Sequence, residues 1–204
     1  MIDARLRRII DPPLDRIGAM LAGVGITANQ VTVTGFFIGM LAVPLLAYEH
    51  YAVALAAIGA NRLSDGLDGA VARHSGMTDL GGYLDIVADF VFYSAVVFGI
   101  ILARPQDAVW GAFLIFSFIG TGTSFLAYAI FAEKRQLSTT IRGKKSIYYL
   151  GGLTEGFETI VALCLMCLFP AAFWLIALVF GMMCWLTTMS RVAWARGTLV
   201  ETRV

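Results

Sequence analysis

The chain has 204 residues, of which 59% are hydrophobic and only 14% are charged, and its formal net charge is +1. Soluble domains are about 45–50% apolar and about 25% charged, so this composition excludes an ordinary soluble domain and indicates an integral membrane protein. A membrane-spanning helix needs about 20 apolar residues, which leaves space for about six spans and for no separate soluble domain. We therefore predict an all-α integral membrane protein with one membrane domain over residues 1–204.

Residues 1–25 combine basic and large apolar side chains. The basic residues of this segment are Arg5, Arg7, Arg8 and Arg16. The pattern is typical of an amphipathic segment that lies on the membrane surface, and Pro12 and Pro13 are expected to interrupt it. Thr27 or Asn29 is expected to cap the helix that follows.

A six-transmembrane-helix bundle is predicted for residues 26–196, followed by a tail at 197–204. The apolar runs place the spans at residues 31–48, 51–73, 80–103, 108–132, 153–169 and 171–194. Nearly all Lys and Arg residues fall in segments that an even number of spans places on one side. The positive-inside rule therefore predicts that both termini are cytoplasmic in an inner (cell) membrane protein.

Four aspartates lie inside the second and third predicted spans. A carboxylate at membrane depth costs at least about 2.5–3.5 kcal/mol, so four of them need a neutralising partner. Asp65 and Asp68 are spaced i,i+3, and Asp85 and Asp89 are spaced i,i+4, so each pair lies on one face of its helix. A short turn can direct both pairs at one point, where a divalent cation with oxygen ligands is the natural occupant. The alternative is a structural ion pair with Arg62, although one arginine cannot neutralise four acids.

Residues 65–89 read DGLDGAVARHSGMTDLGGYLDIVAD. This segment resembles the signature of the CDP-alcohol phosphotransferase family, D-x-x-D-G-x-x-A-R followed by G-x-x-x-D-x-x-x-D. The matching residues are Asp65, Asp68, Gly69, Ala72, Arg73, Gly81, Asp85 and Asp89. The resemblance extends to the six-helix layout and to TANQVT before the first span, where Asn29 and Thr32 fit. The segment between Arg73 and Gly81 is shorter than the family usually has, which bears on how the donor's cytidine is held.

The resemblance implies transfer of a phosphatidyl group from a CDP-linked donor to an alcohol, with release of CMP. Two divalent ions, Mg²⁺ or Mn²⁺ in its place, are expected to bind the pyrophosphate and stabilise charge on the leaving CMP. Asp89 is expected to be the general base that accepts the proton of the acceptor hydroxyl. The implied metal ligands are Asp65, Asp68, Asp85 and Asp89. The implied CDP-binding residues are Asp65, Gly69, Ala72, Arg73, Gly81, Asn29 and Thr32.

A basic loop at residues 133–152 and one arginine of the sixth span suggest a site for a phosphorylated acceptor. Its residues are Arg142, Lys144, Lys145 and Arg191. Attraction to anionic lipid headgroups, or topology alone, explains the same residues equally well. The first candidate pair of substrates is CDP-diacylglycerol and glycerol 3-phosphate.

Membrane lipid and a second copy of the chain are the other expected partners, the homodimer from the resemblance alone, and no nucleic acid is expected. The alternative function is a divalent-cation transporter that uses the same aspartates, but the chain shows no repeated halves.

Cys164 and Cys167 have C-x-x-C spacing, and without a second ligand pair they are better explained by buried packing. Asp79 could cap the third span or be a ligand, and the cap is favoured. Glu155 and Glu158 could bind an acceptor, but structural roles at the start of the fifth span are favoured.

Overall fold

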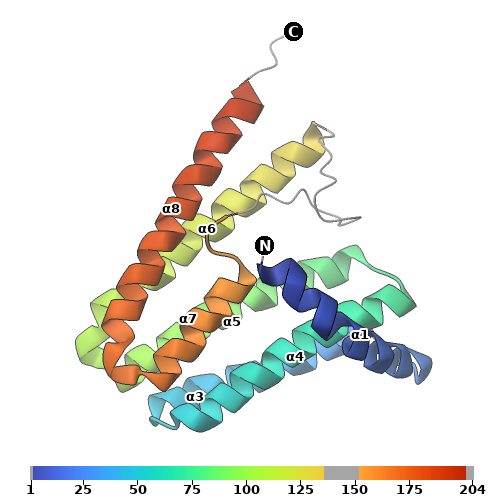
Figure 1. The fold of residues 1–204 in the computed structure, drawn as a ribbon, viewed down its shortest axis with the longest axis horizontal. Helices are drawn as coiled ribbons and strands as arrows, with labels where there is room; N and C mark the ends of the chain where they lie inside the picture. The colour runs from blue at the N-terminus through green and yellow to red at the C-terminus, as the bar shows by residue number, and fades with distance from the viewer. Residues whose placement is uncertain (1, 136–151, 201–204) are drawn as a thin grey trace. The chain divides into compact units, whose positions relative to one another are not determined.

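The computed structural model describes residues 2–135 and 152–200, and within these residues every regular element is a helix (Figure 1). This confirms the all-α prediction. The chain divides into two compact units, Met1–Pro105 and Gln106–Val204, which are described separately below. The organisation of residues 1–204 as one domain stays a prediction.

The first unit contains five α-helices. They are α1 (Ile2–Gly23), α2 (Ala28–Met40), α3 (Ala42–Ala47), α4 (Tyr51–Ser75) and α5 (Asp79–Ala103). Thr27 caps α2, since its hydroxyl accepts the Gln30 N–H at 3.3 Å and the Gln30 side chain accepts the Thr27 N–H at 2.9 Å. The predicted first span is divided into α2 and α3 because Pro44 has no N–H to donate to the carbonyl one turn earlier.

Helix α1 continues through Pro12 and Pro13, so the expectation that these prolines interrupt the segment was wrong. The two missing N–H groups weaken the helix locally. Packing on α4 provides the compensation: the buried Leu14 lies so close to Gly66 that a Cβ there would be 2.7 Å from the leucine methyl carbon. Contact with a neighbouring helix therefore outweighs the local preference of the sequence.

Helices α2 and α4 pack closely and antiparallel through small residues. Gly35 of α2 lies against Ser64, and Gly39 lies against Asn61. The Asn61 side-chain amide donates to the Gly35 carbonyl at 2.9 Å, a bond that needs the close approach that glycine allows. The same kind of contact occurs at Gly99, where α5 meets α3.

The second unit contains α6 (Ala108–Lys134), α7 (Gly156–Leu168) and α8 (Phe173–Val200), with 3₁₀ turns η1 (Pro105–Asp107) and η2 (Pro170–Ala172). Helices α6 and α8 run side by side in the same direction (Figure 1). The Tyr128 hydroxyl lies 3.2 Å from the Thr198 hydroxyl along this contact. Glu155 and Glu158 form a capping box at the start of α7, which confirms their structural role.

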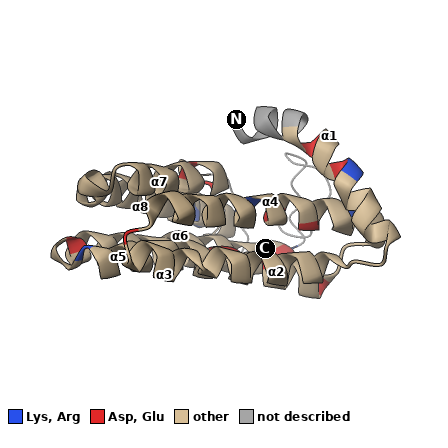
Figure 2. Cartoon of the chain, turned by 90° about the horizontal axis from the view of Figure 1, so that it is seen from below, with Lys and Arg blue, Asp and Glu red and all other residues tan. Residues whose placement is uncertain are grey.

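In the described part of the chain, four stretches are long and apolar enough to cross a membrane, and their ribbons carry few charged residues (Figure 2). They are Ala28–Ala47, Asp79–Ala103, Pro105–Lys134 and Pro170–Val200. Helix α4 has the length of a span but carries two arginines as well as two aspartates of the motif, and α7 has 13 residues. The chain therefore has the features of a multi-pass membrane protein, whereas the count of six spans stays a prediction.

We predict that Gly18→Ala destabilises the contact of α1 with α4 by about 1–3 kcal/mol, the usual cost of overpacking. The new Cβ would lie 2.6 Å from the Ala70 Cβ and 2.8 Å from its carbonyl carbon. Gly59→Ala in α4 is the matched control, because a Cβ there meets no described atom within 4 Å and both changes raise helix propensity. Thermal unfolding of the purified protein and limited proteolysis of α1 provide the measurement. Equal melting temperatures and cleavage rates for the two variants would contradict this packing.

Candidate active site

Helices α4 and α5 form a hairpin whose short turn sets the position of every acid in the motif. Gly76 ends α4 with φ of +99°, a conformation that favours glycine. Thr78 begins α5, since its hydroxyl accepts the Gly81 N–H at 3.1 Å. Asp79 is the first helical residue and not the N-cap, so that prediction was wrong: the threonine one position earlier has the extended backbone that a cap requires.

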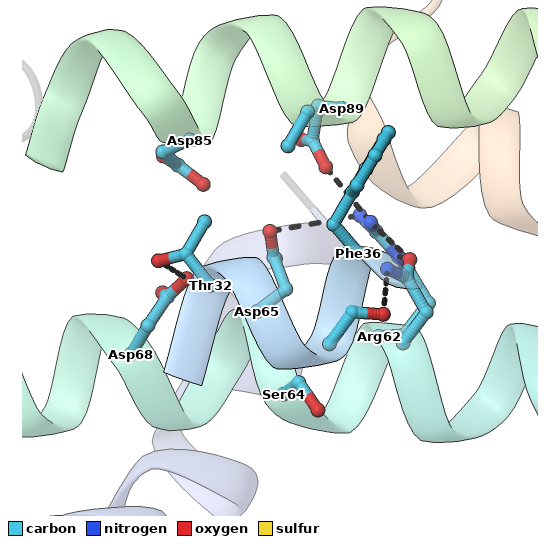
Figure 3. A pocket seen from close by; sticks show the side chains of 11 residues that line it. Thr32, Phe36, Arg62, Ser64, Asp65, Asp68, Asp85 and Asp89 are labelled. Atoms are coloured by element: carbon cyan, nitrogen blue, oxygen red, sulfur yellow. Dashed lines mark hydrogen bonds and ion pairs between the residues drawn. The ribbon is translucent and has the colours of Figure 1, made fainter. Parts of the chain in front are cut away.

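The length of the turn places acids of the two helices opposite each other. At 1.5 Å per residue, Asp68 and Asp85 lie about 10 Å and about 9 Å from the turn, and Asp65 and Asp89 both lie about 15 Å from it. Figure 3 shows the four side chains pointing into the space between the two helices. Both pairs of aspartates therefore converge on one recess, as predicted. Helix α2 closes this recess on a third side.

Three of the four carboxylates are close enough to share a cation. Oxygen atoms of Asp65, Asp85 and Asp89 all lie within 4.8 Å of one another. Opposite ligands of an octahedral Mg²⁺ are about 4 Å apart, so small side-chain rotations would bring these oxygens into ligand geometry. An all-oxygen donor set of this kind fits a hard divalent cation.

Asp68 lies outside this group of three. Its side chain is buried, and its Oδ2 accepts the hydroxyl hydrogen of Thr32 on α2 at 2.6 Å. Thr32 is thus in the recess, where the resemblance predicted it, although in this structure it contacts an acid. The role of Asp68 as a metal ligand stays a prediction.

Arg62 makes an ion pair with the acidic cluster. The structural ion pair that the sequence offered as an alternative is therefore present together with the candidate metal site. Its Nη2 donates to Asp89 Oδ1 at 2.8 Å, and its Nη1 lies 3.7 Å from Asp65 Oδ1. Tyr93 accepts from Arg62 Nη1 at 3.2 Å and donates to Asp89 Oδ2 at 3.0 Å. Tyr93 is not among the site residues predicted from the sequence, although its position four residues after Asp89 places it on the same face of α5.

The glycines predicted to bind CDP are near the recess. A Cβ at Gly81 would lie 3.1 Å from Asn29 Oδ1, so the structure brings these two predicted residues together. Among the residues that the structure describes, a Cβ at Gly69 would meet only the Arg73 guanidinium, at 3.7 Å. Ala72 lies one turn beyond Asp68 on the same helix. Their roles as nucleotide ligands stay predictions.

Arg73 is paired with α1. Its Nε and Nη2 donate to Asp15 Oδ1 at 2.9 Å and 2.6 Å, and both side chains are about half exposed. The resemblance implied that Arg73 binds CDP, and the pairing with Asp15 is not predictable from the local sequence. A phosphate would therefore have to share this guanidinium with Asp15.

Arg142, Lys144 and Lys145 of the predicted acceptor site lie outside the described residues. Arg191 lies in the second unit, where it is buried. Its Nη1 donates to the Thr121 carbonyl at 2.9 Å, and its guanidinium carbon is 5.5 Å from the centre of the Phe125 ring. Its role in acceptor binding stays a prediction.

Comparison with known proteins agrees with this site. A family model described as CDP-alcohol phosphatidyltransferase matches residues 25–193. "Inner membrane protein YnjF" of Escherichia coli strain K12 is 52% identical over 193 residues, which cover 94% of each chain. An archaetidylinositol phosphate synthase of Pyrococcus horikoshii is 41% identical over 106 residues, 48% of this chain and 53% of the relative.

The fold is also similar to a solved structure. A phosphatidylinositol phosphate synthase of Mycobacterium tuberculosis, crystallised with CDP-DAG bound, has a TM-score of 0.70 at 20% identity. The match covers 88% of this chain and 92% of that one. A second structure of the same enzyme, in complex with manganese and citrate, has a TM-score of 0.68 at 19% identity and covers 88% and 87% of the two chains.

We predict that Asp85→Asn weakens Mn²⁺ binding to the purified protein by about tenfold or more, since losing one charged ligand costs at least about 1.4 kcal/mol of binding free energy. The free Mn²⁺ signal in electron paramagnetic resonance measures this affinity without substrate. Asp79→Asn is the control, because it removes the same charge from the first turn of α5, outside the group of three carboxylates. If both variants bound Mn²⁺ as the parent does, Asp85 would not be a ligand.

Proposed function

Since the chain belongs to the CDP-alcohol phosphatidyltransferase family, we propose that it transfers a phosphatidyl group from CDP-diacylglycerol to a small polar alcohol and releases CMP. The observation that carries this proposal is the recess where the motif aspartates of α4 and α5 converge. The similar M. tuberculosis enzyme was crystallised with CDP-DAG bound, which supports the choice of donor. The proposed product is a phospholipid or a phospholipid precursor.

The carboxylates of Asp65, Asp85 and Asp89 would hold two divalent cations together with Asp68, which would complete the ligand set after exchanging its contact with Thr32. Such cations supply Lewis-acid stabilisation of the pyrophosphate and of the leaving phosphate. We propose Mg²⁺, with Mn²⁺ able to replace it, and the manganese complex of the M. tuberculosis enzyme is consistent with a divalent ion.

Asp89 would act as the base. Arg62 and Tyr93 each donate to a different oxygen of its carboxylate, which fixes the direction of the group and leaves further lone pairs on both oxygens. The acceptor hydroxyl would pass its proton to this carboxylate while its oxygen bonds to the β-phosphorus. The bond between that phosphorus and the CMP oxygen would break in line, with no covalent enzyme intermediate.

The acceptor proposed here is a phosphorylated polyol. Two relatives named archaetidylinositol phosphate synthase, 41% and 34% identical over about half of the chain, support an inositol phosphate over the glycerol 3-phosphate first expected. The residues proposed to hold its phosphate are Arg142, Lys144, Lys145 and Arg191. Charge-assisted bonds from several cations are the usual way to select a phosphorylated acceptor over its plain alcohol.

The proposed setting is an inner membrane crossed by six spans, with both termini in the cytoplasm and the chain paired as a homodimer. The name of the E. coli relative supports this location. Helix α4 would then cross the membrane because its acids face the recess and not the lipid. The family match gives no support to the alternative of a divalent-cation transporter.

We predict that Asp89→Asn lowers CMP release by about 10²–10⁴-fold, the usual contribution of a general base. The assay combines purified protein, CDP-diacylglycerol and Mg²⁺ with inositol phosphate, glycerol 3-phosphate, inositol or glycerol. Asp79→Asn is the matched control and should turn over at the parent rate. Undiminished turnover by Asp89→Asn would remove the base assignment, and CMP release with plain inositol but not with its phosphate would remove the acceptor assignment.

A further inference from the structure

Arg62 is fixed more firmly than an arginine that only neutralises a nearby acid. Its Nε and Nη2 donate to Asn61 Oδ1 at 2.9 Å and 2.5 Å, and Asn61 is itself anchored to the Gly35 carbonyl. The guanidinium carbon lies 4.9 Å from the ring centre of Phe92 and 5.3 Å from that of Tyr93. The side chain is 17% exposed, so its position is set by protein contacts on several sides.

This guanidinium lies beside two of the three carboxylates that could share a cation. It bonds to Asp89 Oδ1 at 2.8 Å and lies 3.7 Å from Asp65 Oδ1, and both acids belong to that group. Among the described residues that line the recess, it is the one cationic side chain and faces four acids. Four negative charges and one positive charge leave a formal charge of −3, which two divalent cations would convert to +1.

We propose that Arg62 is a positioning residue and an internal counter-ion, which competes with divalent cations for Asp65 and Asp89 while it holds the Asp89 carboxylate in place. The positioning role of Arg62 rests on the proposed function. The competition with divalent cations concerns the protein without substrate and can be measured independently. A cation that shares an oxygen of Asp89 would lie within a few Å of the guanidinium, where like charges repel strongly.

The competition has a physical advantage. Without Arg62, four carboxylates would repel one another whenever the recess held no metal, which would destabilise the fold. With Arg62, cations bind weakly to the substrate-free protein and are held well only when the negative pyrophosphate is also present. Loss of that ligand after the reaction would then loosen the cations again.

The first test measures Mn²⁺ affinity by electron paramagnetic resonance on the full chain in detergent, with no nucleotide present. Arg62→Gln should bind Mn²⁺ tighter by about tenfold or more, because a unit charge near the ion has been removed. Arg62→Lys keeps the charge and should bind within about threefold of the parent. A purely structural role predicts weaker Mn²⁺ binding in both variants, together with lower thermal stability.

Arg104→Gln is the matched control for charge. Arg104 follows the last residue of α5 and lies 15 residues beyond Asp89, about 22 Å along the helix axis. Its removal changes the net charge of the same unit equally and should leave Mn²⁺ affinity unchanged. An equal tightening in both variants would show a general charge effect and overturn the proposal.

The second test separates positioning from charge by measuring kcat and KM for CMP release. Arg62→Lys should lower kcat by about tenfold or more with little change in KM for CDP-diacylglycerol, because one amine cannot reproduce the fork of bonds to Asp89 and Asn61. Tyr93→Phe should lower kcat less and leave Mn²⁺ affinity near the parent value, because it removes one donor and no charge. Unchanged kcat in Arg62→Lys would overturn the positioning role.

The two readouts keep the inference and the proposed function distinguishable. Tighter Mn²⁺ binding by Arg62→Gln in a protein that releases no CMP with any acceptor would support the counter-ion and contradict the proposed reaction. If the parent released CMP but Arg62→Gln bound Mn²⁺ as the parent does or more weakly, the proposed reaction would be supported and the counter-ion role would be contradicted. If Arg62→Gln does not fold, Arg62→Met, which keeps the apolar stem and also removes the charge, replaces it in the Mn²⁺ measurement, and the kcat of Arg62→Lys decides the positioning role.

Discussion

Mutual repulsion among four carboxylates in one recess is the constraint on which the arrangement of the first unit depends. Two of these acids accept hydrogen bonds, either from residues on other helices or from a residue one turn along the same helix. Thr32 of α2 donates to Asp68, and Arg62 and Tyr93 donate to the two oxygens of Asp89. The helices therefore do more than present acids to a ligand. They also stabilise the negative charge when no ligand is bound.

Helix α2 is the third wall of the recess, and it contributes a backbone carbonyl as well as the Thr32 hydroxyl. The Gly35 carbonyl accepts from Asn61, Asn61 accepts from Arg62, and Arg62 donates to Asp89. Four residues on three helices are thus joined by hydrogen bonds. The same contact of α2 with α4 that packs the helices also orients the carboxylate proposed as the base.

Much of this unit could be predicted from the sequence because its signals are local. The predicted spans at 51–73 and 80–103 differ from α4 and α5 by at most two residues at either end. Helical spacing of the aspartates was enough to predict that each pair shares a face, and the short turn was enough to predict that the pairs meet. The residues that match the family signature led to the prediction of phosphatidyl transfer with release of CMP.

What the sequence did not show depends on contacts between distant segments. The ion pair of Arg73 with Asp15 joins residues 58 positions apart, and no local pattern identifies that partner. Helix α1 persists through two prolines because α4 supports it, which a local rule cannot anticipate. Tyr93 was missed for a different reason. An aromatic residue in an apolar span usually has a packing role. Its role at the site depends on the hydrogen bond that it accepts from Arg62 across the hairpin, which the sequence does not show.

The glycines of α2 have a consequence for how this protein tolerates change. A Cβ at Gly39 would lie 2.8 Å from the Asn61 side-chain amide, and one at Gly35 would collide with Ser64. Neither glycine has a side chain at the site, yet a larger residue at either position would displace the Asn61 side chain that supports Arg62. Both positions are therefore expected to tolerate a larger residue poorly, although neither supplies a ligand or a proton acceptor.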